Sequence, residues 1–281
     1  MSENDGIYLP PGRALAKAEL RPKKSFGQNF LIADDVLLDI ARAATDGLEG
    51  LSVVELGAGT GALTRALLAR GARVAAVERD RDLIPILQNQ FHAELADGRL
   101  RLIEGDAQHV DTVALGGGSA ILTGNLPYQI TGTLVEKAVH EAKHWKRIVF
   151  MVQAEVADRM AALPDTEDYG ALSIFVQAAF QARRLRTVPP QCFLPPPNVT
   201  SAVVVLNPHA VPRAEETPLF RQLVKLAFGQ RRKTLRNAWK TIAEGSTVAD
   251  AAFRAGISLD ARGETLAVED YARMASELGK T

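Results

Sequence analysis

The four residues Asn125-Leu126-Pro127-Tyr128 combine groups that can hold the exocyclic amine of a nucleobase. Such an amine is a poor nucleophile because its lone pair is delocalised into the ring, and two acceptors that take both hydrogens favour a pyramidal nitrogen. The side-chain oxygen of Asn125 and the carbonyl of Leu126 are two such acceptors. Pro127 restricts the turn, and the ring of Tyr128 can stack on a base. Taken alone, the same four residues also fit an ordinary proline turn.

A glycine-rich turn, Glu55-Leu56-Gly57-Ala58-Gly59-Thr60-Gly61, follows a predicted strand and precedes a predicted helix. Glycines there allow a tight turn and let the backbone approach a bound nucleotide closely. Glu78 ends the next strand, where a carboxylate can accept both hydroxyls of a ribose. Asp106 follows the third strand and is placed to accept from an adenine amino group. The ends of three successive strands are thus expected to form one nucleoside site.

Two cofactors fit this site. Gly57, Gly59 and Ala62 satisfy the permissive dinucleotide pattern G-x-G-x-x-A. One interpretation is therefore an oxidoreductase that binds a nicotinamide dinucleotide. Glu55 and the expected contact at Asp106 favour S-adenosylmethionine, which has a ribose and an adenine but no pyrophosphate.

The spacing of apolar residues predicts strands that alternate with helices. Strands are expected at 51–56, 73–77, 100–103, 120–123, 148–152 and 201–206, and helices at 62–70, 83–95 and 131–144. This alternation indicates right-handed βαβ units and a parallel sheet that is covered on both faces.

Two domains are predicted. The stretch 187–197 holds five of the 14 prolines and is expected to be an ordered loop or a hinge, and from Pro218 onward the period is helical. We expect a catalytic domain at 1–210, in which residues 1–20 are a poorly ordered extension, and a small helical domain at 211–281.

Charge is divided unevenly along a chain whose formal net charge is zero. Residues 34–177 hold 13 basic and 21 acidic side chains, whereas residues 178–240 hold 11 basic and 2 acidic ones. Such asymmetry is expected when one face meets phosphates. The basic cluster Arg231, Arg232, Lys233 and Arg236 is the candidate RNA-binding site, with Lys23, Lys24, Arg183, Arg184 and Arg186 as an extension. A solvated helix face is the other reading of the cluster.

A single cysteine, Cys192, excludes a disulfide framework, and no Cys and His cluster has the spacing of zinc ligands. We therefore expect no metal. The first thirty residues lack the apolar core of a signal peptide, and no apolar run approaches membrane-spanning length. A cytoplasmic protein without a membrane partner is expected.

Eight motifs share their pattern with one known family, at residues 24–31, 55–61, 78–80, 105–107, 124–128, 153–157, 169–173 and 189–202. On these motifs the chain closely resembles the bacterial small-subunit ribosomal RNA adenine N6,N6-dimethyltransferases, the KsgA/RsmA family of adenine dimethylases. The resemblance implies an α/β fold, with a Rossmann-like S-adenosylmethionine-dependent methyltransferase sheet and a small C-terminal all-helical domain.

The resemblance also implies which residues act. Cofactor contacts are implied at Asn29, Leu31, Gly57, Glu78, Asp106 and Asn125, and a catalytic group of Asn125, Leu126, Pro127, Tyr128 and Phe193. Phe193 matches the aromatic that faces the target base opposite Tyr128, although from the residues alone it is a core anchor of the Pro-rich loop. In the family, the segment around Asn29 folds over the cofactor.

The implied reaction is dimethylation of two adjacent adenosines in the 3′-terminal hairpin of 16S ribosomal RNA, within a 30S precursor late in its biogenesis. A monomer is expected, because nothing in the sequence resembles a dimer seam. Two alternatives stay open: a methyltransferase that acts on large-subunit RNA, and a non-catalytic ribosome assembly factor. The stretches 26–28 and 195–199 favour the small-subunit enzyme.

Overall fold

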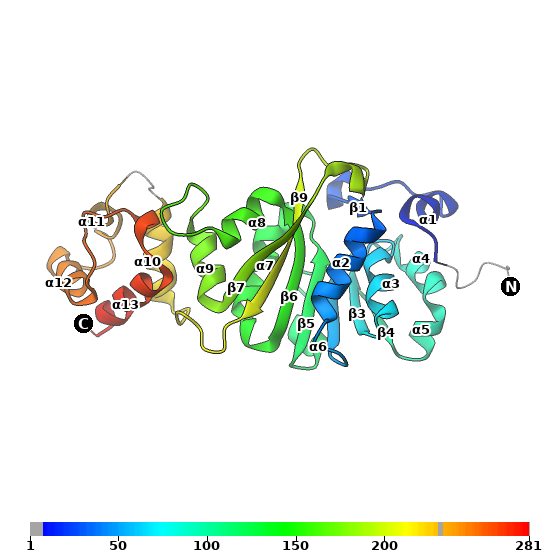
Figure 1. The fold of residues 1–281 in the computed structure, drawn as a ribbon, viewed down its shortest axis with the longest axis horizontal. Coiled ribbons are helices and arrows are strands. Elements are labelled where there is room, and N and C mark those ends of the chain that lie inside the picture. The colour runs from blue at the N-terminus through cyan, green and yellow to red at the C-terminus, as the bar shows by residue number, and fades with distance from the viewer. Residues whose placement is uncertain (1–7, 230–232, 281) are drawn as a thin grey trace. The chain divides into compact units, whose positions relative to one another are not determined.

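One sheet of seven strands dominates the computed structural model, which describes residues 8–229 and 233–280 (Figure 1). The strand order is β4-β3-β2-β5-β6-β9-β7. These strands are β2 (Ser52–Leu56), β3 (Arg73–Glu78), β4 (Leu100–Glu104), β5 (Ala120–Asn125), β6 (Trp145–Gln153), β7 (Phe180–Val188) and β9 (Ser201–Pro208). All six predicted strands are present.

Five neighbouring strands, β4-β3-β2-β5-β6, are parallel, as predicted. Val54 of β2 pairs with Ala75 of β3 on one side and with Leu122 of β5 on the other. The sheet is nevertheless mixed, because β9 runs antiparallel to β6, with Val149 opposite Val205. The central strands are almost completely buried, since helices cover both faces of the sheet.

Eight helices connect or precede the strands up to residue 161, within the described part of the chain. They are α1 (Pro11–Lys17), α2 (Asp34–Thr45), α3 (Ala62–Ala69), α4 (Ile84–Gln90), α5 (His92–Ala96), α6 (Thr112–Gly116), α7 (Thr131–His140) and α8 (Ala154–Ala161). In Figure 1, α2 and α3 lie in front of the sheet and α7 lies behind it, as right-handed crossovers in opposite directions require.

Local details differ from the predicted pattern. The helix expected at 83–95 is broken at Phe91, whose φ of −117° leaves the helical range and separates α4 from α5. The edge strand β7 was not predicted, because only Phe180 and Val188 are buried and its sequence, FQARRLRTV, lacks a strand's apolar alternation.

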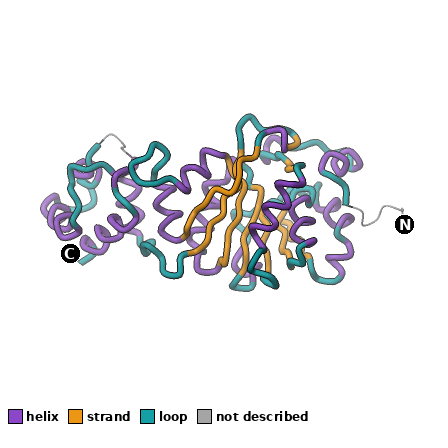
Figure 2. Tube along the Cα trace, viewed as in Figure 1, coloured by secondary structure: helices purple, strands orange, loops and turns teal. Residues whose placement is uncertain are grey.

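A second, two-stranded sheet joins distant parts of the chain. In it, β1 (Phe30–Leu31) pairs antiparallel with β8 (Phe193–Leu194), the second of which lies in the Pro-rich stretch. Figure 2 shows this short pair apart from the large sheet, beyond the ends of its strands. Two-residue strands carry no periodic pattern, so the sequence could not predict this pairing.

The expected N-terminal extension is more ordered than predicted from residue 8 onward. Leu15 of α1 is 4% exposed and packs with Phe30 and Leu83, and the backbone N–H of Leu9 donates to Gln90 Oε1 at 2.7 Å. Buried apolar contacts and a long-range hydrogen bond hold this part of the chain.

The chain divides into two compact units, one of residues 1–157 and 183–207 and the other of residues 158–182 and 208–281. The predicted boundary at 210 lies within a few residues of the observed one, but residues 158–182 belong to the helical unit rather than to the catalytic domain. Tyr169 shows why, because it is fully buried in the helical core and its hydroxyl donates to the carbonyl of Leu266 at 2.9 Å.

The helical unit contains α9 (Ala171–Ala179), α10 (Pro218–Gly229), α11 (Leu235–Ala238), α12 (Gly245–Ala255) and α13 (Val268–Leu278). Its core is built on large aromatic side chains such as Phe220, Trp239 and Tyr271. The polar atoms of these aromatics are satisfied: Trp239 Nε1 donates to Leu223 and the Tyr271 hydroxyl to Gly263, each at 2.9 Å.

Candidate cofactor and base site

A cavity opens at the edge of the sheet where the parallel strands end. Its lining includes eight of the predicted site residues: Asn29, Gly57, Glu78, Asp106, Asn125, Leu126, Pro127 and Tyr128. They come from the ends of β2, β3, β4 and β5 and from the segment that precedes β1. The ends of parallel strands meet at one edge, which is why residues so far apart in sequence share one cavity.

The glycine-rich turn has the backbone that its composition predicts. Gly57, Gly59 and Gly61 all have positive φ, at 76°, 60° and 87°. A Cβ at Gly59 would lie 3.2 Å from the ring of Phe30, and one at Gly61 would overlap the ring of Phe91. Glycine is therefore required here by conformation and by close packing.

Glu78 is held rigidly beside this turn. It is 6% exposed, its Oε2 accepts from the backbone N–H of Gly59, and its Oε1 accepts from that of Asp80, both at 2.7 Å. Burial raises the pKa of Glu78, while the backbone hydrogen bonds oppose the shift. Each carboxylate oxygen has a further lone pair, so Glu78 can still accept hydroxyls from a ligand.

Asp106 lines the cavity just beyond the end of β4, the strand next to β3, and one of its carboxylate oxygens accepts a hydrogen bond within a local turn. Its Oδ1 accepts from the backbone N–H of Gln108 at 2.9 Å, and its Oδ2 lies 3.4 Å from a guanidinium nitrogen of Arg79. Arg79 in turn lies over the ring of Phe26, with 4.9 Å between the guanidinium carbon and the ring centroid. Phe26 and Arg79 also line the cavity; both lie within the family motifs 24–31 and 78–80, but neither was predicted as a site residue.

Asn125 is the last residue of β5, and its amide has a defined orientation. Its Nδ2 donates to the carbonyl of Asn29 at 2.9 Å. Because a carbonyl can only accept, the atom that faces Asn29 is the NH₂ group, and Oδ1 is the acceptor left for a ligand. The same hydrogen bond ties the segment around Asn29 to the end of β5.

Burial and hydrogen bonds fix the other three residues of the tetrapeptide. Leu126 is 1% exposed, and its backbone N–H donates to the carbonyl of Met151 at 3.0 Å. The carbonyl of Pro127 accepts from Ile130 and from the hydroxyl of Thr131, both at 3.1 Å. The Tyr128 hydroxyl lies 2.6 Å from Ser201 Oγ, and burial raises its pKa. The Tyr128 ring is thus positioned by a neutral hydroxyl.

Two residues implied by the family resemblance lie elsewhere in the structure. Leu31 is 4% exposed and lines a smaller adjoining cavity. Phe193, opposite Leu31 in the β1 and β8 pair, is 3% exposed within the hydrophobic core and is not among the described residues that line either cavity. The burial of Phe193 is compatible with the residue-based interpretation as a core anchor, and its implied role at the target base stays a prediction.

The smaller cavity contains buried polar groups. Glu55 is 1% exposed and accepts from the Thr64 hydroxyl at 2.6 Å. Burial raises the pKa of Glu55 to about 8, so this group is a neutral acid at neutral pH. The Thr60 hydroxyl is also buried and has no hydrogen-bond partner within the described part of the chain. A carboxyl with a raised pKa and a buried hydroxyl thus lie at the two ends of the glycine turn.

The predicted RNA-binding cluster is only partly described by the structure. Arg231 and Arg232 lie outside the described residues. Lys233 is exposed, and Arg236 pairs with Asp260 at 3.1 Å with 59% of its side chain exposed. Two residues of the proposed extension are engaged within the chain, which reduces their availability to phosphates: Lys23 pairs with Asp80 and Asp82, and Arg186 with Asp35 and Asp39.

The chain is similar to known methyltransferases over nearly its whole length. Residues 19–280 match the family described as ribosomal RNA adenine dimethylase. The ribosomal RNA small subunit methyltransferase A of Anaeromyxobacter sp. (strain K) is 44% identical, over 97% of this chain and 99% of that protein.

Two solved structures share the fold. The dimethyladenosine transferase from Plasmodium falciparum has a TM-score of 0.76 at 24% identity and covers 89% of this chain and 98% of its own. The 23S rRNA methyltransferase ErmE has a TM-score of 0.68 at 24% identity and covers 89% of this chain and 100% of its own. At this identity the two structures support the fold alone.

S-adenosylmethionine, the methyl donor of this family, fits the residues of the cavity. Glu78 and Asp106 carry carboxylates that can accept from ribose hydroxyls and an adenine amine, and the glycine turn leaves room for close approach. Arg79 is the one basic side chain among the described residues that line the cavity, and it lies 3.4 Å from Asp106. Within the described residues no cluster of side chains could hold a metal ion, and no helix is long and apolar enough to span a membrane.

The family match over nearly the whole chain, the full-length relative and the cavity that unites Gly57, Glu78, Asp106 and Asn125 lead to one conclusion: the chain belongs to the ribosomal RNA adenine dimethylase family.

Proposed function

We propose that this chain transfers methyl groups from S-adenosylmethionine to the N6 amines of two adjacent adenosines in the 3′-terminal hairpin of 16S ribosomal RNA. The reaction takes place on a 30S precursor, late in its assembly. The observation that carries the proposal is the oriented amide of Asn125, whose Oδ1 is the free acceptor at the edge of the cofactor cavity. The full-length small-subunit relative supports the choice of RNA.

The residues around Asn125 perform catalysis by positioning. Oδ1 of Asn125 and the carbonyl of Leu126 accept the two N6 hydrogens, and the nitrogen lone pair is thereby directed at the methyl group. The cofactor supplies an electrophilic methyl on a sulfonium. As positive charge develops on N6, both acceptors interact with it more strongly, and the proton leaves to solvent afterwards. No general base is needed in this scheme.

Tyr128 holds the ring of the target base in this proposal. Stacking on an aromatic ring contributes about 1–3 kcal/mol per base, which offsets the few kcal/mol needed to unstack it. The anchored turn around Tyr128 keeps its ring in place before the base arrives. Phe193, which is buried in the protein without RNA, is the aromatic that the family resemblance implies on the other side of the base.

Methylation of purified particles tests this function. Incubation with S-adenosylmethionine and a 30S precursor that lacks the modification should produce primer-extension stops at two adjacent adenosines near the 3′ end of 16S RNA. Purified 23S RNA serves as the comparison substrate and should stay unmodified. Modification of 23S RNA instead would favour the large-subunit alternative, and binding to the precursor without methylation would favour the assembly factor.

The helical unit and its basic cluster are the proposed RNA-binding surface. The cluster lies in the stretch 178–240, which has nine more basic than acidic residues, from 11 and 2. Structured RNA is recognised largely through its backbone and shape, which suits a cationic surface. The proposed working form is a cytoplasmic monomer that binds the precursor particle.

Loss of the basic cluster should weaken RNA binding in a salt-dependent way. Changing Arg231, Arg232 and Lys233 together to alanine is expected to lower affinity for the precursor. The slope of log affinity against log salt should become shallower by about one for each phosphate that the variant no longer neutralises. Filter binding between low and moderate salt measures this slope.

A charge-matched variant controls for net charge. Arg73, Arg99 and Arg101 are solvent-accessible and lie where β3 and β4 begin, at the sheet edge opposite the cavity. Their joint change to alanine should leave the salt slope unaltered. Equal salt slopes in both triple variants would favour the alternative interpretation, in which the cluster at 231–233 is a solvated helix face that does not bind RNA.

A further inference from the structure

One wall of the cofactor cavity is made by a continuous segment, residues 25–30. It begins with a single 3-10 turn at Lys24–Phe26 and continues through Gly27, whose φ is +62°. A short segment without regular hydrogen bonds depends on side-chain contacts to hold its position. What fastens this wall therefore decides whether the cavity has a defined shape.

The later part of the wall is fastened by contacts already described. Asn125 holds the carbonyl of Asn29, and Phe30 pairs with Leu194 in the two-stranded sheet. These contacts lie at residues 29–31. In the earlier part, residues 23–28, Arg79 lies over the ring of Phe26, and the side chains of Lys23 and Gln28 make polar contacts.

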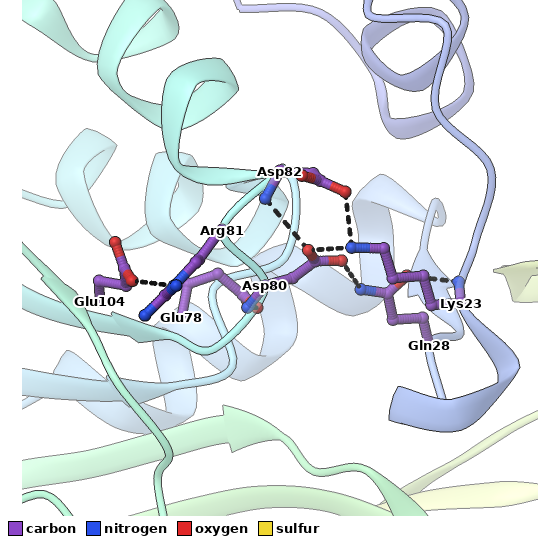
Figure 3. Close-up of polar contacts among 7 residues, drawn as sticks. All are labelled: Lys23, Gln28, Glu78, Asp80, Arg81, Asp82 and Glu104. Carbon is purple, nitrogen blue, oxygen red and sulfur yellow. Dashed lines mark hydrogen bonds and ion pairs between the residues drawn. The ribbon is translucent and has the colours of Figure 1, made fainter.

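Asp80 holds that earlier part. Its Oδ1 accepts from Lys23 Nζ at 2.5 Å, and its Oδ2 accepts from Gln28 Nε2 at 2.7 Å. Figure 3 shows Lys23 and Gln28 reaching Asp80 from the segment, with Asp82 beside them. Asp82, about half exposed, accepts from the same Lys23 Nζ at 2.7 Å.

Burial makes the Asp80 contacts strong. The Asp80 side chain is 3% exposed, whereas that of Lys23 is 35% exposed. Burial of the carboxyl opposes its ionisation, yet the hydrogen bonds from Lys23 and Gln28 hold the pKa of Asp80 below its usual range. Without these two partners the buried carboxylate would keep only the hydrogen bond from the Asp82 backbone N–H, at 3.1 Å, and would lose its counter-charge, which is costly. The segment also closes on itself, since the Lys23 backbone N–H donates to Gln28 Oε1 at 2.7 Å.

Glu78, the carboxylate proposed to hold the ribose of the cofactor, lies two residues before Asp80. The backbone N–H of Asp80 donates to Glu78 Oε1, and Glu78 Oε2 accepts from Gly59 of the glycine turn. Through two adjacent turns, Asp80 thus links the position of the segment to the orientation of Glu78. Displacement of residues 23–28 would open the wall and loosen the acceptor for the ribose together.

We propose that Asp80 is a positioning residue that latches residues 23–28, through Lys23 and Gln28, over bound S-adenosylmethionine, and so sets how tightly the cofactor is held. Asp80 touches neither the reacting atoms nor the cofactor, because it is not among the described residues that line the cavity. The latch acts on cofactor affinity and leaves the transfer step to Asn125. The proposal rests on S-adenosylmethionine being the ligand of this cavity.

The experiment measures S-adenosylhomocysteine binding by calorimetry, without RNA, and KM and kcat for S-adenosylmethionine with the 30S precursor. Asp80→Asn keeps the shape of the side chain and removes its charge. It should raise Kd for S-adenosylhomocysteine and KM for S-adenosylmethionine at least tenfold, while kcat at saturating cofactor stays within about twofold. Lys23→Met, at a position that is 35% exposed, should likewise raise Kd and KM and leave kcat nearly unchanged.

The double variant and a control sharpen the test. In the double variant, Lys23→Met should add little to the rise in Kd caused by Asp80→Asn, because both changes remove the same Lys23–Asp80 interaction. Arg81→Gln breaks the neighbouring exposed pair with Glu104, which Figure 3 also shows, and should leave Kd unchanged.

An unchanged Kd in Lys23→Met, or a fall in kcat without a rise in KM, would overturn the latch. If Asp80→Asn fails to fold, Lys23→Met alone decides. If the unaltered protein does not bind S-adenosylhomocysteine, the cofactor assignment fails rather than the latch.

Discussion

Replacement of Asn125 by alanine is expected to abolish nearly all methyl transfer, with a fall in kcat of about 10²–10³-fold. The variant lacks the Oδ1 acceptor that would hold one N6 hydrogen and stabilise the developing charge, and removal of one such group typically costs about 10²–10³ in rate. It also lacks the hydrogen bond to the Asn29 carbonyl, worth about 1 kcal/mol. Cofactor binding should therefore weaken only about fivefold. Single-turnover methylation of the 30S precursor measures the first effect and calorimetry the second.

Asn207 provides the matched control for this prediction. It is also an asparagine near the end of a strand, but it lies in β9 at the opposite edge of the sheet, where its Oδ1 accepts from Arg147 at 3.1 Å. Asn207→Ala should retain the full rate. Full activity in Asn125→Ala would refute the acceptor mechanism, and a large loss in Asn207→Ala would show that the assay reports stability instead.

Replacement of Glu78 by glutamine is expected to weaken S-adenosylhomocysteine binding about 100-fold. Hydrogen bonds to a charged group contribute about 1.5–3 kcal/mol each, and the amide would lose those to the ribose. Its NH₂ group would also face a backbone N–H, of Gly59 or Asp80, that now donates to a carboxylate oxygen. The free protein should lose about 1–3 kcal/mol of unfolding free energy for the same reason. Calorimetry and urea unfolding measure the two effects separately.

Glu104 is the control at the same level of the sheet. It stands directly opposite Glu78 in the pairing of β3 with β4, but its side chain is 47% exposed and it is not among the described residues that line the cavity. Glu104→Gln should bind S-adenosylhomocysteine normally, since exposed ion pairs such as that with Arg81 contribute little to stability. Normal binding by Glu78→Gln would remove Glu78 from the cofactor site.

The strands and the order of motifs could be predicted because they are local properties of the sequence. Apolar runs such as 51–56 and 120–123 report burial in the middle of a sheet, and a glycine turn between strand and helix has few other uses. The mixed character of the sheet could not be predicted, because a strand such as β9 has the same apolar pattern in either direction.

The surroundings of single side chains could not be predicted from the sequence. Phe193 is aromatic and follows a Pro-rich stretch, and only the packing of β8 against β1 decides that its ring is buried. Arg186 belongs to a basic stretch, yet its guanidinium pairs with Asp35 and Asp39 of α2. Whether a side chain faces the core, a partner or solvent depends on neighbours that are remote in sequence.

The amino-acid sequence by itself determined the Asn125-Leu126-Pro127-Tyr128 turn, the glycine turn and the acidic residues Glu78 and Asp106 at successive strand ends. Periodic burial and the geometry of parallel strands are sufficient to bring these residues to one edge. Only the tertiary structure decided the orientation of the Asn125 amide, the neutral state of Glu55 and the latch at Asp80. These depend on hydrogen bonds and burial between distant segments, such as Lys23 and Asp80, which no local pattern encodes.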